Sequence, residues 1–307
     1  MSRQLVIGSR GSKLALWQAE QARHALLGLQ AGLDVRIEII KTTGDVKSEP
    51  LSVIGGKGVF TKELEDALLD GRIDIAVHSL KDLPTIIPQS LTITAICERE
   101  DPRDALVLRA GSEVDARALE NLPRGATVGT SSQRRVAQLR CWRDDLVIED
   151  LRGNVDTRIR KLDEGQYDAV ILASAGLVRL GLQDRISLRI PIEHMLPAVG
   201  QGAIAIETRS DDALAIEATA RLDHHETRVA CLAERAFLRG LGGGCQLPIA
   251  GHAHFEGELL KLDGLVARPD GWKRVQDSLS GSPENAEALG ASLAATLIER
   301  GASTLLQ

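Results

Sequence analysis

The sequence predicts an α/β protein in which two similar domains are followed by a smaller α+β domain. Its 307 residues exceed the size at which one hydrophobic core stops growing, so two or three domains are expected. The N-terminal third alternates apolar, strand-like runs with amphipathic segments. A weak internal repeat matches residues 71–77 with 165–171, each after a helical pattern, and the pattern changes from about Leu222.

The residue pattern of the N-terminal third predicts three strands and two helices. The strands are expected at residues 5–8, 35–40 and 73–77. Ser12 can cap the first helix, whose apolar side chains recur every three or four positions, and residues 61–69 predict the second. This alternation is typical of a mostly parallel sheet covered by helices.

The second domain is expected to resemble the first. Besides the repeat already given, residues 6–9 correspond loosely to residues 127–130. Paired α/β domains commonly bind ligands at the carboxyl ends of their strands, where helix N-termini and loop amides favour anions. We therefore expect an anionic ligand.

The residue pattern of the C-terminal part predicts a helix, a loop, strands and a final helix. The first helix extends from about Leu222 to Arg239, and the loop covers residues 240–248. Strand patterns follow at 249–255 and 259–266, with a further short strand before a helix at about 285–300.

Composition excludes several classes of protein. Apolar residues at 43% and charged residues at 26% are typical of a globular chain with a buried core. No apolar run approaches the roughly 20 residues of a membrane span, and no export signal is seen, so a cytoplasmic location is expected. The cysteines and histidines lack the spacing of a disulfide framework or zinc site, so no metal is expected.

Arginine dominates the basic residues. The net charge of −6 argues against a general nucleic-acid binder, yet 28 of the 37 basic residues are Arg, and eight of them lie between Arg124 and Arg160. Guanidinium groups bind planar carboxylates and phosphates bidentately, which makes a small polyanion a candidate ligand. A solvated basic surface remains the alternative.

Three segments carry candidate binding or catalytic side chains. In residues 78–84, Asp82 follows a predicted buried strand and is flanked by basic and hydroxyl side chains, with a turn-capping role as the less favoured alternative. Residues 129–135 and 151–158 each combine a loop with Arg side chains that would suit several carboxylates. We expect these Arg-bearing loops to line a solvent-filled cleft.

Two glycine-rich loops complete the candidate set. Residues 55–58 contain Lys57 but lack the Ser or Thr of a phosphate-binding loop, so they predict either a flap or a plain surface loop. Residues 240–248 place Cys245 after three glycines, with its sulfur open to approach, although a lone Cys is more often a small core residue.

The order of these segments resembles the porphobilinogen deaminase family over nearly the whole chain. The matching runs are RGSKLALWQ at 10–18, GGKGVF at 55–60, HSLKDLP at 78–84, GTSSQRR at 129–135, LRGNV at 151–155, GQGA at 200–203 and GGCQLP at 243–248. Val53 and Asp156 depart from residues that some relatives carry, which affects only expected flap or cofactor contacts.

The resemblance implies a transferase of tetrapyrrole (heme or chlorophyll-type) biosynthesis. Members join four porphobilinogen molecules head to tail on a dipyrromethane cofactor, releasing ammonia and then hydroxymethylbilane. The cofactor is held by a thioether to the cysteine that matches Cys245. The fold implied has two domains like those of periplasmic binding proteins, at 1–99 with 200–217 and at 100–199, and a third at 218–307. A monomer that binds neither nucleic acid nor membrane is expected.

The resemblance also assigns roles to individual residues. Asp82 is the expected catalytic carboxylate. The expected cofactor-binding residues are Cys245, Lys81, Asp82, Ser131, Arg134, Arg135 and Arg152. The expected substrate-binding residues are Arg10, Ser12, Arg152, Arg158 and Arg179, with Lys57 and Phe60 on the flap.

Two other classes of protein are compatible with parts of the sequence. A non-catalytic, two-domain anion-binding protein would share the fold and the Arg-rich loops. A nucleic-acid-binding protein using Arg134 and Arg135 is disfavoured by the acidic balance and by the presence of only seven aromatic residues.

Overall fold

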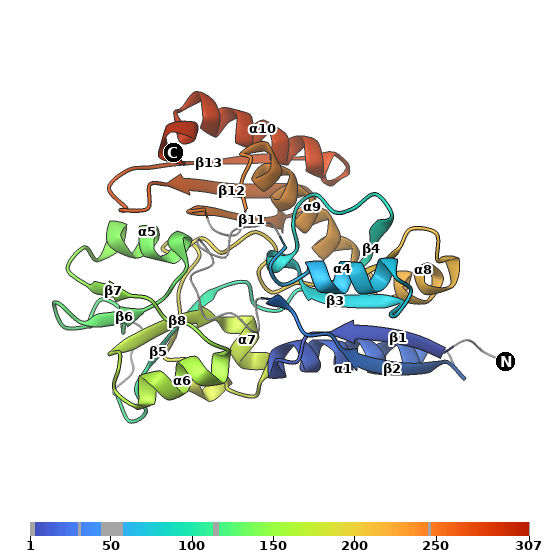
Figure 1. Ribbon diagram of the computed structural model, residues 1–307. Helices are drawn as coiled ribbons and strands as arrows, with labels where there is room; N and C mark the ends of the chain where they lie inside the picture. Colours follow the sequence, from blue (N-terminus) through green and yellow to red (C-terminus); the bar gives the residue numbers. More distant parts are fainter. Residues whose placement is uncertain (1–3, 30–31, 44–57, 113–116, 245–246, 307) are drawn as a thin grey trace. The chain divides into compact units, whose positions relative to one another are not determined.

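A computed structural model describes residues 4–29, 32–43, 58–112, 117–244 and 247–306 (Figure 1). The chain forms two compact units, Met1–Glu100 with Ala203–Val229 and Asp101–Gly202 with Ala230–Gln307. Among the helices of the described ranges, none has both the length and the apolar character that a bilayer span needs.

The first unit contains a five-stranded mixed sheet in the order β2-β1-β3-β10-β4. β1 is parallel to β2 and β3, whereas β10 is antiparallel to both β3 and β4. The strands are β1 Gln4–Ser9, β2 Asp34–Ile39, β3 Ile75–Ser79, β4 Leu91–Ile96 and β10 Ile204–Arg209. Since β10 comes from far along the chain, the sequence leaves this unit and later returns to complete its sheet.

Helices cover both faces of this sheet. Leu5 and Ile7 of β1 pack with α1 and α8, whereas the intervening Val6 packs with α4, as the two-residue period of a strand requires. The helices are α1 Lys13–Leu29, α4 Lys62–Leu69 and α8 Ala213–Ala220. The Ala15 amide donates to Ser12 Oγ over 3.3 Å, which confirms the predicted N-terminal cap of α1.

The second unit contains a sheet with the same arrangement, in the order β7-β6-β8-β5-β9. β6 is parallel to β7 and β8, and β5 is antiparallel to β8 and β9. The strands are β5 Asp104–Leu108, β6 Thr127–Gly129, β7 Val147–Glu149, β8 Ala169–Ala173 and β9 Leu188–Arg189. The helices are α5 Gln133–Trp142, α6 Val155–Asp163 and α7 Ser174–Arg179.

The internal repeat of the sequence corresponds to equivalent places in these two sheets. Asp74 precedes β3 and accepts a hydrogen bond from the Val6 amide of β1 over 2.9 Å. Asp168 precedes β8 and accepts one from the Thr127 amide of β6 over 2.8 Å. Each carboxylate also pairs, at 2.9 Å, with an arginine at the end of the antiparallel strand. The predicted similarity of the two α/β parts is therefore confirmed down to a shared polar contact.

The C-terminal segment forms an antiparallel sheet in the order β11-β12-β13 (orange to red in Figure 1). Its elements are α9 His225–Gly240, β11 Ile249–Glu256, β12 Leu259–Ala267, β13 Arg274–Gly281 and α10 Ala286–Glu299. Helix α10 approaches α9 closely, since a Cβ on Gly290 would lie 2.1 Å from the Ala233 carbonyl oxygen. The predicted fold class, with two similar α/β parts and a small α+β part, is confirmed.

Candidate functional site

Asp82 lies directly after strand β3, in a short 3-10 turn made by Leu80–Asp82. The start of this turn is anchored, because Leu80 is buried and its amide donates to the Ala203 carbonyl oxygen over 3.0 Å. The Asp82 side chain is half-buried, and no described residue donates to its carboxylate. Asp82 therefore does not cap the turn, and its oxygens can accept bonds from a ligand.

The basic and hydroxyl side chains just before Asp82 are engaged elsewhere. His78 is buried within β3, and its Nε2 lies 2.9 Å from Glu207 Oε2 on the neighbouring strand β10. Ser79 Oγ accepts a bond from Gln18 Nε2 over 2.9 Å. Burial raises the pKa of Glu65, and the nearby Glu207 raises it further. His78 and Ser79 therefore make contacts within the first unit rather than with Asp82. Lys81 is the half-buried basic residue next to Asp82 in the chain.

Arg10 and Phe60 come together in the first unit. The Arg10 guanidinium carbon lies 4.2 Å from the centre of the Phe60 ring. This distance is typical of a cation–π contact, which orders the long Arg side chain without using all its N–H donors. Ser12, two residues further on, accepts a bond at the start of α1 as described above. The structure thus brings the predicted Arg10 and Phe60 side by side.

Ser131 joins two of the predicted loops. Its Oγ donates to the Leu151 carbonyl oxygen and accepts from the Leu151 amide, each over 3.0 Å. Arg152 follows immediately and is partly exposed, with its Nε 3.7 Å from Asp150 Oδ2. Arg158 Nε donates to the Gly153 carbonyl oxygen over 2.7 Å. The loop that carries Arg152 is therefore held at both ends by hydrogen bonds.

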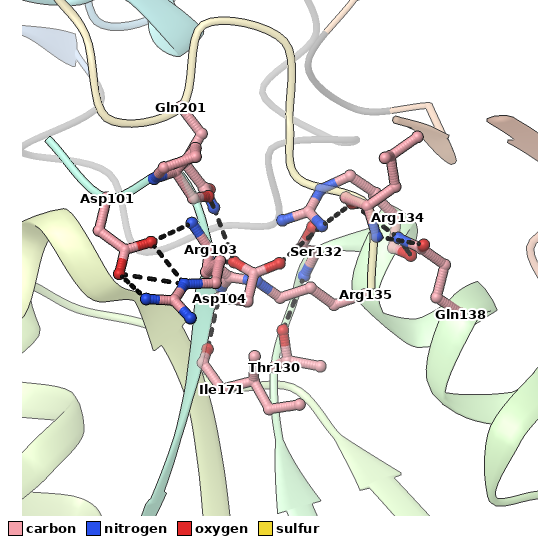
Figure 2. A network of polar contacts seen from close by, with 12 residues as sticks. Asp101, Arg103, Asp104, Thr130, Ser132, Arg134, Arg135, Gln138, Ile171 and Gln201 are labelled. Atoms are coloured by element: carbon pink, nitrogen blue, oxygen red, sulfur yellow. Dashed lines mark hydrogen bonds and ion pairs between the residues drawn. The ribbon is translucent and has the colours of Figure 1, made fainter. Parts of the chain in front are cut away.

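Arg134 and Arg135 converge on Asp104 at the start of β5 (Figure 2). Arg134 Nη1 donates to Asp104 Oδ2 and to the Leu196 carbonyl oxygen, each over 2.7 Å. Arg135 donates to Asp104 Oδ1 from Nε over 3.0 Å and from Nη2 over 2.7 Å, and its Nη1 donates to the Ile171 carbonyl oxygen. Asp104 is fully buried, and the two arginines are only 4% and 5% exposed.

The expectation that these two arginines line a solvent-filled cleft is wrong. Burial alone would raise the pKa of Asp104, but the guanidinium groups of Arg134 and Arg135 hold it well below its usual range. A buried carboxylate stays charged in this way only when it is closely paired. Two guanidinium groups share one carboxylate, so this triad carries one net positive charge, which suits an anion.

The predicted run at 200–203 belongs to the same network. Gln201 Nε2 donates to Asp104 Oδ1 over 2.9 Å and to the Pro102 carbonyl oxygen over 2.7 Å. Arg179, at the end of α7, is buried and donates from Nη2 to the Gly202 carbonyl oxygen over 2.6 Å. Arg179 is therefore linked through the chain at 201–202 to the carboxylate that holds Arg134 and Arg135.

Within this network, Asp104 and Gln201 are polar residues whose role the sequence did not reveal. Asp104 precedes the apolar run at 105–108, and a charged residue at the start of a buried strand was the available signal. Lys57 and Cys245 lie outside the described residues, and so does Val53. The remaining predicted residues lie within the described ranges, in one or the other unit.

Comparison with known proteins supports one family. A model described as "Porphobilinogen deaminase, dipyromethane cofactor binding domain" matches residues 5–217, and one for the C-terminal domain of porphobilinogen deaminase matches residues 228–299. The second substrate-binding domain of a putative amino acid ABC transporter from Streptococcus pneumoniae is similar with a TM-score of 0.44 and 13% identity, covering 78% of this chain and 95% of that one.

Full-length relatives carry the same family name. The porphobilinogen deaminase of Pelotomaculum thermopropionicum is 50% identical, covering 100% of this chain and 97% of that protein. The porphobilinogen deaminase of a Roseiflexus species is also 50% identical, with 100% and 99% covered. Since the two family models together span most of the chain and these relatives match it from end to end, the chain belongs to the porphobilinogen deaminase family.

Proposed function

We propose that this protein is a porphobilinogen deaminase, a transferase also called hydroxymethylbilane synthase. It joins four porphobilinogen molecules head to tail on a covalently bound dipyrromethane with loss of ammonia at each addition, and hydrolysis then releases hydroxymethylbilane. The observation that carries the proposal is the match of the dipyrromethane-binding family model to residues 5–217, together with full-length relatives at 50% identity.

The Arg residues fit a ligand that carries many carboxylates. Each porphobilinogen bears an acetate and a propionate, so the growing chain gains two negative charges with each addition. The net positive charge of the Asp104, Arg134 and Arg135 triad supports anion binding, since an unpaired charge in a buried site is costly. We assign carboxylate binding to Arg10, Arg134, Arg135, Arg152, Arg158 and Arg179.

Asp82 supplies the catalytic carboxylate in this proposal. When bound, the dipyrromethane supplies the terminal pyrrole carbon to which the first porphobilinogen is joined. Loss of ammonia from porphobilinogen leaves a cation, and an anion close to the pyrrole nitrogens stabilises the developing positive charge. The protonated acid can also assist the departure of the amine. The half-buried Asp82 carboxylate, which accepts no bond from a described residue, suits both roles.

The remaining assignments rest on the family resemblance. Cys245 forms the thioether to the dipyrromethane, Ser12, Lys81 and Ser131 add hydrogen bonds, and Lys57 and Phe60 belong to a flap. The chain divides into domains at 1–99 with 200–217, at 100–199 and at 218–307. The protein acts as a monomer in the cytoplasm and binds neither nucleic acid nor membrane.

Intact-protein mass spectrometry tests this function. Protein made in cells that synthesise porphobilinogen should exceed its sequence mass by two deaminated porphobilinogen units, and Cys245→Ser should abolish the excess. Cys141→Ser is the matched control, since Cys141 is an exposed thiol and its variant should retain the excess. An unmodified wild-type protein without turnover would refute the proposal and favour a non-catalytic anion-binding protein.

A further inference from the structure

One face of the C-terminal sheet gathers two histidines and an aspartate. His252 and His254 are two residues apart on β11, and Asp263 on β12 lies directly opposite His252 in the antiparallel register. The neighbouring Gly251 lies on the other face, because a Cβ there would be 3.1 Å from the Phe237 ring of α9. The two-residue period of a strand therefore places both imidazoles on the face that points away from Phe237.

The three side chains come close enough to share one ion. Each offers one ligand atom, and these atoms all lie within 4.8 Å of one another. His254 Nδ1 is 4.0 Å from Asp263 Oδ2 and has no hydrogen-bond partner among the described residues. In a tetrahedral site with bonds of about 2.0–2.1 Å, neighbouring ligand atoms are roughly 3.3 Å apart. A small rotation of side chains therefore suffices to bring His254 and Asp263 to this separation.

Neighbouring groups orient two of the three ligands. Glu256 Oε1 lies 3.3 Å from His254 Nε2, which favours a proton on Nε2 and leaves the Nδ1 lone pair toward Asp263. Ser278 Oγ donates to Asp263 Oδ1, so that Oδ2 is the oxygen that faces His254. A carboxylate behind a histidine and a hydrogen bond to a ligating carboxylate are common around protein metal sites.

The local charge also favours a cation. Lys261, which is opposite His254 in the register, has its ammonium group 2.8 Å from Glu256 Oε1. Because Lys261 and Glu256 balance each other, Asp263 leaves the cluster with one net negative charge while both imidazoles are neutral. Two nitrogen ligands and one oxygen ligand suit first-row transition metals better than Ca²⁺ or Mg²⁺, which prefer oxygen.

We propose that His252, His254 and Asp263 bind one divalent transition-metal ion of the Zn²⁺ type. The ion would cross-link β11 to β12, with further coordination positions open to water because His254 and Asp263 are only half-buried. The sequence pattern did not predict this site, because the third ligand comes from the next strand. The proposal does not depend on the proposed enzymatic function.

Zn²⁺ titration of the tag-free, full-length protein by calorimetry tests the site. We expect one equivalent to bind, and His254→Ala and Asp263→Asn each to weaken binding by at least about tenfold. His24→Ala, which changes an exposed histidine on α1, and Cys141→Ser are controls that should bind as the wild type does. Circular dichroism of the metal-free variants should match the wild type, which separates a lost ligand from a lost fold.

Co²⁺ provides a second, spectroscopic measurement. Bound Co²⁺ with imidazole ligands should give visible d–d absorption that saturates at one equivalent and is lost in His254→Ala. The proposal is overturned if neither ion binds the wild type at concentrations up to about 100 μM, which corresponds to roughly −5.5 kcal/mol. It is equally overturned if His254→Ala and His24→Ala bind Zn²⁺ with the same affinity, since the two histidine rings would then only stack on each other.

Discussion

Asp104→Asn should destabilise the protein strongly, because it leaves two buried guanidinium groups without a counter-charge. At about 4 Å between charge centres and an effective dielectric constant near 20, each Arg–Asp attraction is worth about 4 kcal/mol. The desolvation of the carboxylate offsets part of the combined attraction, and loss of one partner of a buried pair typically costs about 3–5 kcal/mol. We expect the free energy of unfolding to fall by that amount, although asparagine nearly preserves the shape of the side chain.

The effect should depend on pH in a defined direction. The pKa of Asp104 in the folded protein lies well below the ordinary value of 3.8. A group with a depressed folded-state pKa stabilises the protein above the unfolded pKa and loses this contribution as the pH falls toward the folded pKa. The difference between wild type and Asp104→Asn should therefore be constant from neutral pH to about pH 5 and should shrink below about pH 4.

Urea unfolding followed by circular dichroism and fluorescence measures this difference. Glu164→Gln is the matched control, because it makes the same carboxylate-to-amide change at an exposed pair in which Arg160 Nη1 and Glu164 Oε1 are 2.6 Å apart. That pair, four residues apart at the C-terminal end of α6, should contribute only about 0.3–0.5 kcal/mol. If Asp104→Asn costs no more than Glu164→Gln, the buried-pair reasoning is refuted.

Four further variants test other parts of the structure. Asp82→Asn should fold with an unchanged melting temperature yet lose nearly all turnover of porphobilinogen, and retained turnover would contradict its catalytic role. Gly290→Ala should lower the unfolding free energy by about 1–3 kcal/mol, since its Cβ would meet a backbone oxygen at 2.1 Å. Gly28→Ala, with nothing within 4 Å of its Cβ, should raise the unfolding free energy by about 0.5 kcal/mol, and equal effects at both glycines would refute the packing argument. Ser131→Ala should cost about 1–3 kcal/mol in urea unfolding because it leaves the Leu151 amide without its partner, and an unchanged midpoint would show that water replaces the hydroxyl.

The sequence predicted the fold class well because strand and helix periodicities are local. The repeat at 71–77 and 165–171 corresponds to β3 and β8, which hold the same place in their sheets. The predicted strand at 73–77 begins at Ile75 instead, because Asp74 bonds the Val6 amide through its side chain. Such a contact joins residues 68 positions apart, and local patterns carry no information about it.

The candidate site was less predictable, because arginines from the same Arg-rich part of the sequence have different surroundings in the structure. Arg152 is partly exposed, and its Nε lies 3.7 Å from the exposed Asp150 carboxylate, whereas Arg134 and Arg135 are buried against Asp104, about thirty residues away along the chain. An excess of arginine indicates anion binding only for those guanidinium groups whose charge the protein leaves uncompensated. In the Asp104 triad the protein supplies one negative charge for two positive ones, so Arg134 and Arg135 can be buried and still attract an anion. In the proposed function, the carboxylate-bearing ligand therefore meets the one positive charge that Asp104 leaves on this triad.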